Sequence, residues 1–498
     1  MAGATQSREG TPVSTALIAG AGPVGLWLAC ELRLRGIDAV VIEPRTERDP
    51  HSKALTIHPR TLEIFAQRGV VEEFLERGIR VPAGHFGALE SRLDFKALDT
   101  AFPFTLVYPQ AETERILEER ALSLGADVRR GHRVTGLVSD TDQVQVTIDD
   151  SAGNEYCLET EFLCGCDGSG STVRKAASIG FEGHDANTFG ILADVQLSER
   201  PASGYSFSGI TGQLMVVPMP GGLYRIVGID ASRQDPTQYI PDFDEFRSSV
   251  LAIAGTDFGM HSPVWISRYG NASRIAIRYG HHRVALAGDA AHIHFPAGGV
   301  GMNVGIHDAH ALGWRIADIL TGLAPMELIE DYHAERHAVG EDLILGTQAQ
   351  TAVLAAYDPD RQALRALLNT LINDVPELSA ALANRLSGLS VVYPAPPGAH
   401  RSTGRRVVTG DTTDALLRRA DINGNAIMYD PQDQLTPGGD ADLLAQNIVR
   451  VVADSPAESA AAMLVRPDGH IAWAQDNGIT TPDLAAAIAH MRHRQLHL

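Results

Sequence analysis

Cysteine is scarce in this chain of 498 residues, which contains only Cys30, Cys157, Cys164 and Cys166. Four cysteines are too few for a disulfide framework, and none forms a Cys-x-x-Cys pair. Residues 400–498 contain no cysteine, which excludes thiol–disulfide exchange by that region because the reaction requires a thiolate. Cys164 and Cys166 alternate with apolar neighbours in an expected strand, and we expect both to be buried as small hydrophobic side chains.

Long hydrophobic runs and an excess of positive charge are also missing. No run approaches the roughly 18 apolar residues of a membrane-spanning helix. The 41 basic and 61 acidic residues give a net charge of −20, so the chain lacks the basic surface of a nucleic-acid-binding protein and any attraction to anionic membranes. The segment Met1–Ser14 is polar and lacks the apolar core of a secretory signal, and we therefore expect a cytoplasmic protein.

A glycine-rich turn is the most informative feature that is present. The sequence G-A-G-P-V-G at Gly20–Gly25 lies between an apolar run, residues 16–19, and an expected helix, residues 26–35. A second apolar run, residues 39–42, ends in Glu43. This order is the dinucleotide-binding fingerprint, in which the pyrophosphate lies at the positive helix N-terminus and the acid accepts hydrogen bonds from the adenosine ribose.

Two further motifs follow expected strands. They are C-D-G-S-G-S-T-V-R-K at Cys166–Lys175 and A-G-D-A-A-H at Ala287–His292. Asp289 in the second motif would project from the carboxyl edge of the sheet, where ligands bind. The segment H-I-H-F-P-A-G-G-V-G-M-N, residues 292–303, leads into a helix whose first N–H groups would face that ligand. Asp167 has two interpretations, a cofactor contact or a side chain that satisfies its own turn.

In this order the three motifs resemble class A FAD-dependent aromatic monooxygenases, which have the para-hydroxybenzoate hydroxylase fold. The resemblance implies an α/β fold with a Rossmann-like FAD-binding domain, a β-sheet substrate-binding domain and a C-terminal thioredoxin-like domain. The expected boundaries are residues 1–180 and 276–390 for the FAD-binding domain, 181–275 for the substrate-binding domain, which residues 83–106 would join, and 400–498 for the C-terminal domain.

The resemblance also assigns FAD, bound non-covalently, to a set of residues. The helix that begins near Gly301 would aim the N–H groups of Met302 and Asn303 at the flavin and stabilise its anionic reduced form. Lys53 departs from the family, where Arg is more common, and it lacks the forked guanidinium. The residues expected to bind FAD are Gly20, Gly22, Pro23, Val24, Gly25, Glu43, Arg45, Lys53, Gln110, Asp167, Asp289, Pro296, Gly298, Gly299, Gly301, Met302 and Asn303.

Within the class, the segments Arg129–Val134, Trp265–Arg274 and Arg466–Ala474 are similar to those of aromatic polyketide hydroxylases and rifampicin monooxygenases. The implied reaction uses NAD(P)H and O2 as co-substrates to form a flavin C4a-hydroperoxide, which hydroxylates a polycyclic aromatic phenol. Baeyer–Villiger oxygen insertion, or hydroxylation of another large antibiotic-like aromatic such as rifampicin, is the alternative. A non-enzymatic or NAD-binding role is a third interpretation, which a colourless purified protein would favour.

No general base can be assigned from the sequence. The catalytic candidates are His85, Tyr224 and Pro296. The residues expected to line the substrate cavity are Phe86, Phe104, Met215, Pro218 and Tyr224. A small charged benzoate would need a cationic anchor, for which Arg225 and Arg268 are the candidates.

Four histidines raise the question of a metal site. His292 and His294 precede the expected helix, and His307 and His310 lie three residues apart on it, a spacing typical of metal ligands. No cysteine or paired carboxylate completes a ligand set, so we expect no metal. The expected partner is a small aromatic substrate, and the sequence leaves a homodimer open.

Overall fold

A parallel sheet lies at the centre of the computed structural model, which describes residues 15–201, 205–237, 239–408, 425–429, 443, 446–451, 460, 462–476 and 481–493. Its strand order is β20-β21-β12-β1-β2-β8, and all neighbours except the β20–β21 pair are parallel. The strands are β1 (Thr15–Ala19), β2 (Asp38–Glu43), β8 (Asp127–Arg130), β12 (Phe162–Gly165), β20 (Gly280–His281) and β21 (Val284–Leu286). The predicted parallel α/β sheet is confirmed.

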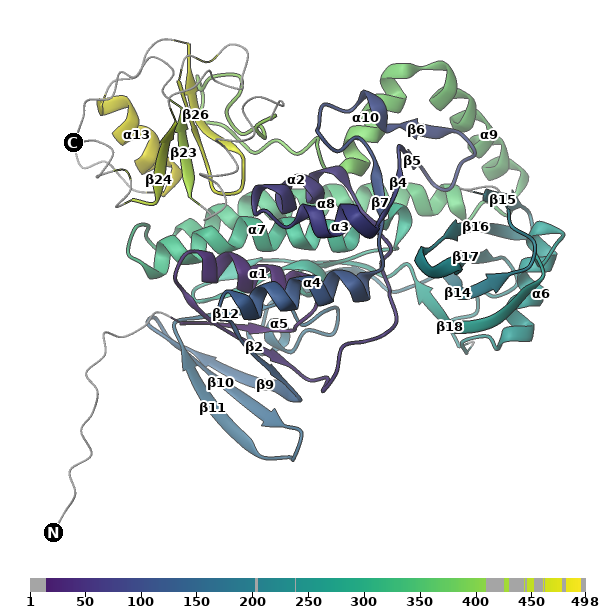
Figure 1. Cartoon of the computed structure of the whole chain (residues 1–498), viewed down its shortest axis with the longest axis horizontal. Coiled ribbons are helices and arrows are strands. Elements are labelled where there is room, and N and C mark those ends of the chain that lie inside the picture. Colours follow the sequence, from purple (N-terminus) through teal and green to yellow (C-terminus); the bar gives the residue numbers. More distant parts are fainter. Residues whose placement is uncertain are drawn as a thin grey trace.

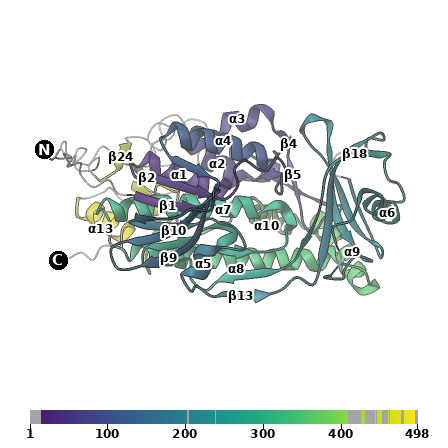
Figure 2. The same ribbon diagram turned by 90° about the horizontal axis from the view of Figure 1, so that it is seen from below.

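Helices cover this sheet because their apolar sides need burial. Helix α1 (Pro23–Leu34) connects β1 to β2 and packs on α7 (Gly301–Leu320) and α4 (Gln110–Ser123). Figure 2 shows α1 and α4 on one side of β1 and β2, with β9 (His132–Ser139) and α5 (Thr172–Ala176) on the other. Helix α1 begins at Pro23, earlier than the predicted residue 26, because proline is favoured in the first turn.

A second, antiparallel sheet lies at the other end of the molecule (Figures 1 and 2). Its strand order is β15-β16-β17-β14-β18, and helix α6 (Phe243–Ala254) packs on one face. Its strands are β14 (Phe189–Leu197), β15 (Tyr205–Gly209), β16 (Gly212–Pro218), β17 (Tyr224–Asp230) and β18 (Met260–Gly270). The face that α6 leaves uncovered forms part of the cavity described below.

Shorter elements and three long helices complete the first 390 residues. The further strands are β3 (Thr56–Ile57), β4 (Ile79–Val81), β5 (Ala83–His85), β6 (Arg92–Asp94), β7 (Thr105–Val107), β10 (Val144–Asp150), β11 (Glu155–Thr160), β13 (Phe181–His184), β19 (Ser273–Ala276) and β22 (His292–Ile293). The further helices are α2 (Pro59–Gln67), α3 (Val71–Arg77), α8 (Leu328–Leu354), α9 (Pro359–Asp374) and α10 (Pro376–Ser387).

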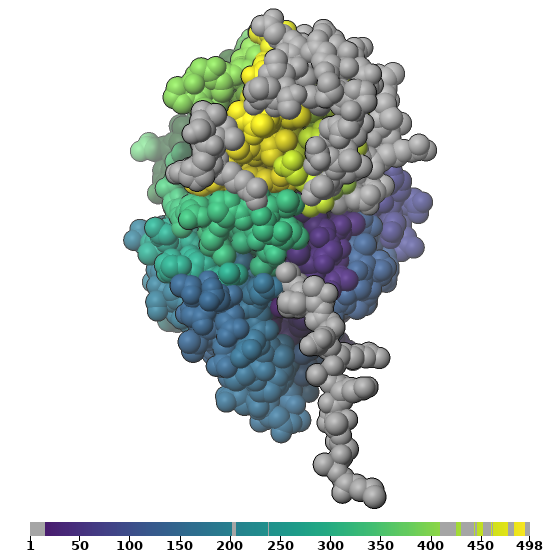
Figure 3. Space-filling model, turned by 90° about the vertical axis from the view of Figure 1, so that its left-hand side faces the viewer, coloured from purple at the N-terminus to yellow at the C-terminus, as the bar shows by residue number. Residues whose placement is uncertain are grey.

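The C-terminal region forms a four-stranded mixed sheet with the order β24-β23-β25-β26. Strands β23 (Ala426–Tyr429) and β24 (Ile448–Val451) are parallel, whereas β25 (Ala462–Val465) and β26 (Ile471–Gln475) are antiparallel to their neighbours. Helix α13 (Thr481–Met491) follows. The thioredoxin-like fold of this region stays a prediction. Figure 3 shows this region, in yellow, lying directly against the green helical part of the molecule.

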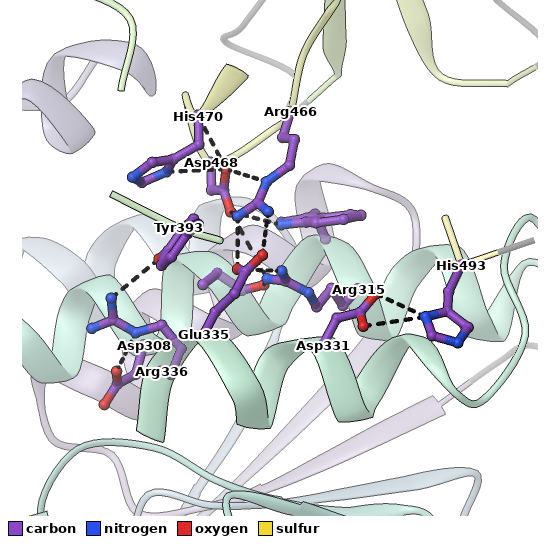
Figure 4. Close-up of polar contacts among 12 residues, drawn as sticks. Asp308, Arg315, Asp331, Glu335, Arg336, Tyr393, Arg466, Asp468, His470 and His493 are labelled. Atoms are coloured by element: carbon purple, nitrogen blue, oxygen red, sulfur yellow. Dashed lines mark hydrogen bonds and ion pairs between the residues drawn. The ribbon is translucent and has the colours of Figure 1, made fainter. Parts of the chain in front are cut away.

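Buried ion pairs connect the C-terminal sheet to α7 and α8 (Figure 4). Arg466 donates to both carboxylate oxygens of Glu335, at 2.6 and 3.0 Å, and also pairs with Asp468. Asp468 accepts a hydrogen bond from the indole N–H of Trp314 at 3.2 Å. Burial alone would raise the pKa of Asp468, but Arg466 and His470 hold it well below its usual value. The R-P-D-G-H turn at 466–470 is therefore an interface element.

Tyr393 lies between the expected domain boundaries at residues 390 and 400. Its side chain is buried, and its hydroxyl accepts a hydrogen bond from Arg336 at 3.2 Å. Cys164 is buried in β12 as expected, whereas Cys166 is only partly buried and lines the cavity because β12 ends at Gly165. Within the part of the chain that the structure describes, no helix has the length and apolar character to cross a membrane.

Replacing Arg466 tests how far the structure depends on this interface. Arg466→Met leaves the carboxylates of Glu335 and Asp468 in a buried site with fewer partners, and we expect the free energy of unfolding to fall by about 3–5 kcal/mol. Urea denaturation followed by circular dichroism measures the change. The matched variant at an exposed position, Arg405→Met, should stay within about 0.5 kcal/mol of the parent protein. An Arg466→Met loss below about 1 kcal/mol would contradict the prediction.

Candidate active site

One large cavity, of about 1150 Å³, lies where the carboxyl ends of the parallel strands meet the open face of the five-stranded sheet. Ligands of open α/β sheets bind at this edge because the loops that follow the strands converge there. Drug-sized ligands generally occupy about 300–1,000 Å³, so this cavity has room for a large cofactor and a further molecule. Its walls contain residues from both halves of the fold.

The first wall is the turn between β1 and α1. Gly20 has a φ of +102°, and a Cβ at this position would lie 2.4 Å from the carbonyl oxygen of Cys166. Gly25 does not line the cavity, and its own Cβ would lie 2.0 Å from the carbonyl oxygen of Gly20. The two glycines thus let strand and helix approach closely. The N-terminus of α1, at Gly22, Pro23 and Val24, opens on the cavity, and Gly22 and Val24 carry N–H groups there, whereas Pro23 has none.

Glu43 ends β2 and is fixed in place by backbone groups. Its Oε2 accepts a hydrogen bond from the N–H of Ala21 at 2.8 Å, and its Oε1 accepts one from the N–H of Arg45 at 3.0 Å. The carboxylate is therefore already oriented at the cavity wall, beside the fingerprint turn. Its contact with a ribose stays a prediction.

The second cofactor wall carries Asp289, which follows β21. This residue is exposed to the cavity, and among the described residues none donates a hydrogen bond to its carboxylate. Arg174 donates to the carbonyl oxygen of the next residue, Ala290, at 2.8 Å and to that of Ser169 at 3.0 Å. Arg174 thus connects the two glycine-rich loops, while Asp289 stays open to a ligand.

Asp167 supports its own turn. Its Oδ2 accepts hydrogen bonds from the N–H groups of Thr172 at 2.6 Å and Val173 at 3.2 Å, and its Oδ1 accepts one from the Ser171 hydroxyl. The carboxylate therefore caps α5. The residue also lines the cavity, so the turn role is observed and the cofactor contact stays a prediction.

The third cofactor wall is the glycine-rich segment before α7. Pro296, Gly298, Gly299, Gly301 and Met302 all line the cavity. The N-terminus of this helix of 20 residues is equivalent to about half a positive charge, which suits an electron-rich ligand edge.

Asn303 holds this segment from behind and does not line the cavity. Its Oδ1 accepts from the N–H of His58 at 2.8 Å, and its Nδ2 donates to the carbonyl oxygens of Thr56 and Gly299 at 3.0 Å. His58 in turn bonds the carbonyl oxygen of Gly298 at 2.8 Å, and burial lowers its pKa to about 4. The side chain of Asn303 therefore positions this segment, and the expected contact of its backbone N–H with the flavin stays a prediction.

The remaining predicted cofactor residues also border the cavity. Val24, Arg45, Lys53 and Gln110 are among its lining residues. Gln110 accepts a hydrogen bond from the N–H of Ala54 at 3.0 Å, which holds the Lys53 loop. Arg45 and Lys53 are exposed cations, and their contact with the cofactor stays a prediction.

Strand alternation determines which side chains of the five-stranded sheet face the cavity. Met215 and Val217 of β16 and Arg225 of β17 line it, whereas Tyr224 packs in the hydrophobic cluster under α6. Successive strand residues point to opposite faces, so the choice of Tyr224 was wrong by one position. Pro218, at the end of β16, lines the cavity as expected.

Of the three candidate residues in the stretch 83–106, one lines the cavity. His85 lines the cavity, and Phe86, the next residue, faces the cluster around Leu89 and Leu93 instead. Phe104 lies under the guanidinium of Arg80, at 5.2 Å, and also stands outside the cavity wall. Phe86 and Phe104 are therefore not lining residues.

The two arginines considered as anchors have other partners. Arg225 forms a buried pair with Asp194 at 2.7 Å and donates to the carbonyl oxygens of Ser52 and Lys53, which ties the sheet to the cofactor loop. Arg268 lies outside the cavity wall, over the ring of Phe189.

The histidines that resembled metal ligands are dispersed. His292 pairs with the carboxylate of Asp308 at 2.7 Å, and His307 pairs with the hydroxyl of Thr61 at 2.9 Å. His294 lines the cavity, and burial lowers its pKa to about 4. Among the described residues no group of three potential ligands converges on one point.

Several further residues line the cavity that were not predicted from the sequence, among them Thr56, Arg92, Gln213, Tyr269 and Phe295. Gln213 had a usable signal, because it shares the two-residue alternation of Met215 and Val217 along β16. The others come from short or irregular segments whose direction depends on tertiary contacts.

Comparison with known proteins identifies the class. Residues 13–347 match the family described as FAD binding domain, and residues 400–493 match the aromatic-ring hydroxylase C-terminal family. The chain is 40% identical to an uncharacterized aromatic compound monooxygenase of Bacillus subtilis (strain 168), over 95% of this chain and 96% of that protein. It is 37% identical to the rifampicin monooxygenase of Streptomyces venezuelae, over 93% of this chain and 95% of that protein.

A solved structure agrees with this result. The anhydrotetracycline hydroxylase from Streptomyces rimosus has a TM-score of 0.85 and 37% identity, over 96% of this chain and 99% of that chain. The chain therefore belongs to the class A FAD-dependent monooxygenases. Its cofactor is FAD, and the predicted α/β fold class is confirmed.

The open carboxylate of Asp289 gives a direct test of the cofactor site. Asp289→Ala should weaken FAD binding about ten- to hundredfold, since a hydrogen bond to a charged acceptor contributes roughly 1.5–3 kcal/mol. Fluorescence titration of the apoprotein with FAD measures the affinity. Asp142→Ala, in an exposed turn, is the matched control and should bind FAD as the parent does. Unchanged FAD affinity in Asp289→Ala would remove this residue from the cofactor site.

Proposed function

We propose that this protein hydroxylates a large polycyclic aromatic phenol, with FAD as cofactor and NAD(P)H and O2 as co-substrates. The observation that carries the proposal is the cavity of about 1150 Å³, in which the cofactor loops and the open face of the antiparallel sheet meet. Relatives named for anhydrotetracycline and rifampicin support a large, multi-ring substrate.

FAD would supply the redox chemistry: it takes reducing equivalents from NAD(P)H and activates O2 for transfer to the substrate. The protein's own residues bind and orient. The fingerprint turn and Glu43 would hold the adenosine half, and Asp289 would hold the chain that leads to the flavin ring. The N-terminus of α7 would stabilise negative charge on the reduced ring.

The five-stranded sheet would hold the substrate. Its cavity face presents apolar side chains, including Met215, Val217 and Val227, and Tyr269 and Phe295 extend this wall. A flat polycycle fits such a surface because apolar contact area gives affinity, while a few polar groups fix orientation. The same contacts would exclude water from the reacting atoms.

Substrate size is the property to test. Steady-state NADPH oxidation and product formation are compared for a tetracyclic phenol and for para-hydroxybenzoate. The tetracyclic phenol should give coupled turnover and a new hydroxyl group, because a single-ring acid would fill little of the cavity and would be poorly oriented. Efficient coupled turnover of the benzoate alone would contradict the proposal. A product with a new lactone oxygen would instead indicate Baeyer–Villiger insertion.

A further inference from the structure

We propose that His85 and Gln213 are two neutral hydrogen-bond donors that hold the oxygen substituents of the substrate, and that the oxygen facing His85 is a phenolate or enolate. This inference rests on the proposed function, because it assigns the chemistry of the molecule that the same cavity accepts. It makes these two residues determinants of specificity for oxygenated polycycles.

The hydrogen bonds of His85 define which ring nitrogen carries the proton. Its Nδ1 accepts a hydrogen bond from the N–H of Ala88 at 3.3 Å. A neutral imidazole that accepts at Nδ1 carries its proton on Nε2. The ring is partly buried in the cavity wall, and within the described part of the chain no group pairs with Nε2. The Nε2–H is therefore available to a ligand.

His85 acts as a donor because it stays neutral. Burial lowers its pKa to about 3, and the nearby cation of Arg92 adds to the effect. A base of this strength is far too weak to deprotonate a phenol, whose pKa is about 10. Arg92 lies opposite His85 in the pairing of β5 with β6, and it lines the same cavity wall. Its positive charge favours a ligand oxygen that carries negative charge.

The backbone that follows His85 is held in a strained conformation. Gly87 and Ala88 have φ values of 53° and 48°, and this left-handed region is uncommon for alanine. Three different elements hold the two residues. Arg365 of α9 donates to both carbonyl oxygens, Ser206 of β15 donates to that of Ala88 at 2.9 Å, and Gln350 of α8 accepts from the N–H of Gly87 at 3.2 Å.

Strain that is held by so many contacts is typical of a functional site. The Ala88 N–H that orients His85 belongs to this clamped turn, so the imidazole is fixed before any ligand binds. Such preorganisation reduces the entropy lost on binding and sharpens the geometry of recognition.

Gln213 supplies the second donor. It lies on β16, is only 2% exposed and lines the cavity, and its Nε2 has no hydrogen-bond partner among the residues that the structure describes. Buried polar groups nearly always have a partner, so an unpaired amide at a cavity wall indicates a ligand.

The two donors are connected through one hydrophobic cluster at the cavity wall. Gln213 pairs with Ile229 across β16 and β17, and Ile229 packs in one hydrophobic cluster with Ala88, the residue that orients His85. A flat ring system in this space can therefore present one oxygen to each donor.

Substitutions of His85 distinguish a role as hydrogen-bond donor from a structural role or a role as a base. The probe is hydroxytetracenequinone, and its binding to FAD-loaded protein is followed through the flavin absorbance. His85→Phe keeps an aromatic ring but removes the donor, and should weaken binding roughly ten- to hundredfold, since the acceptor oxygen is charged. His85→Gln retains an N–H donor and should restore most of the affinity. Both variants should keep the FAD affinity of the parent, and His281→Phe, at an exposed position, should bind the probe normally.

Two results would overturn the assignment of His85. The first is parent-like probe binding by His85→Phe. The second is an equal loss of affinity for tetracenequinone, which lacks the hydroxyl group.

Gln213→Leu gives an independent test, because thermal stability and probe binding should change in opposite directions. Removing an unpaired buried amide should raise the thermal midpoint, whereas probe binding should weaken. A fall in both would show that Gln213 is structural and would overturn its role. If the parent binds the probe and no variant changes binding, this inference fails, whereas the proposed substrate class does not. If the FAD-loaded parent binds neither quinone, the proposed substrate class fails with it.

Discussion

The buried carboxylate of Asp308 holds the cofactor loop on the long helices behind it. Its Oδ2 accepts from the N–H of Gly288 at 3.1 Å and lies 2.7 Å from Nε2 of His292, and its Oδ1 accepts from Nε of Arg336 at 2.7 Å. Burial would raise its pKa, but Arg336 and His292 lower it, so the group stays ionised. Helix α7 carries Asp308 and also presents its N-terminus to the cavity. Asp308 therefore fixes the position of the Asp289 turn relative to that helix end.

The same arginine extends this arrangement to the C-terminal region. Arg336 donates to the hydroxyl of Tyr393, whose ring lies 4.3 Å from that of His470 in the R-P-D-G-H turn. Figure 4 shows these groups with the ion pairs that Arg466 forms with Glu335 of α8 and with Asp468. A region without cysteine thus has a physical role, which is to pack against the two helices that support the flavin loop.

The cofactor half of the site could be predicted from the sequence, because local patterns determine it. Glycine spacing, strand ends and a helix start place Glu43 and Asp289 at one sheet edge without knowledge of the tertiary structure. The substrate half depends on which face each strand presents, and Tyr224 shows that an error of one residue reverses the result. The supporting role of the Asn303 side chain could not be predicted, because its partners, such as Thr56, are distant in sequence.

Oxygen transfer in this cavity is tested most directly by turnover with NADPH and a tetracyclic phenol under isotopically labelled O2. Mass spectrometry of the product should find one labelled oxygen atom in a new hydroxyl group, in an amount that matches the NADPH consumed. An unmodified phenol, with the label recovered only in hydrogen peroxide or water, would contradict a monooxygenase that acts on polycyclic phenols.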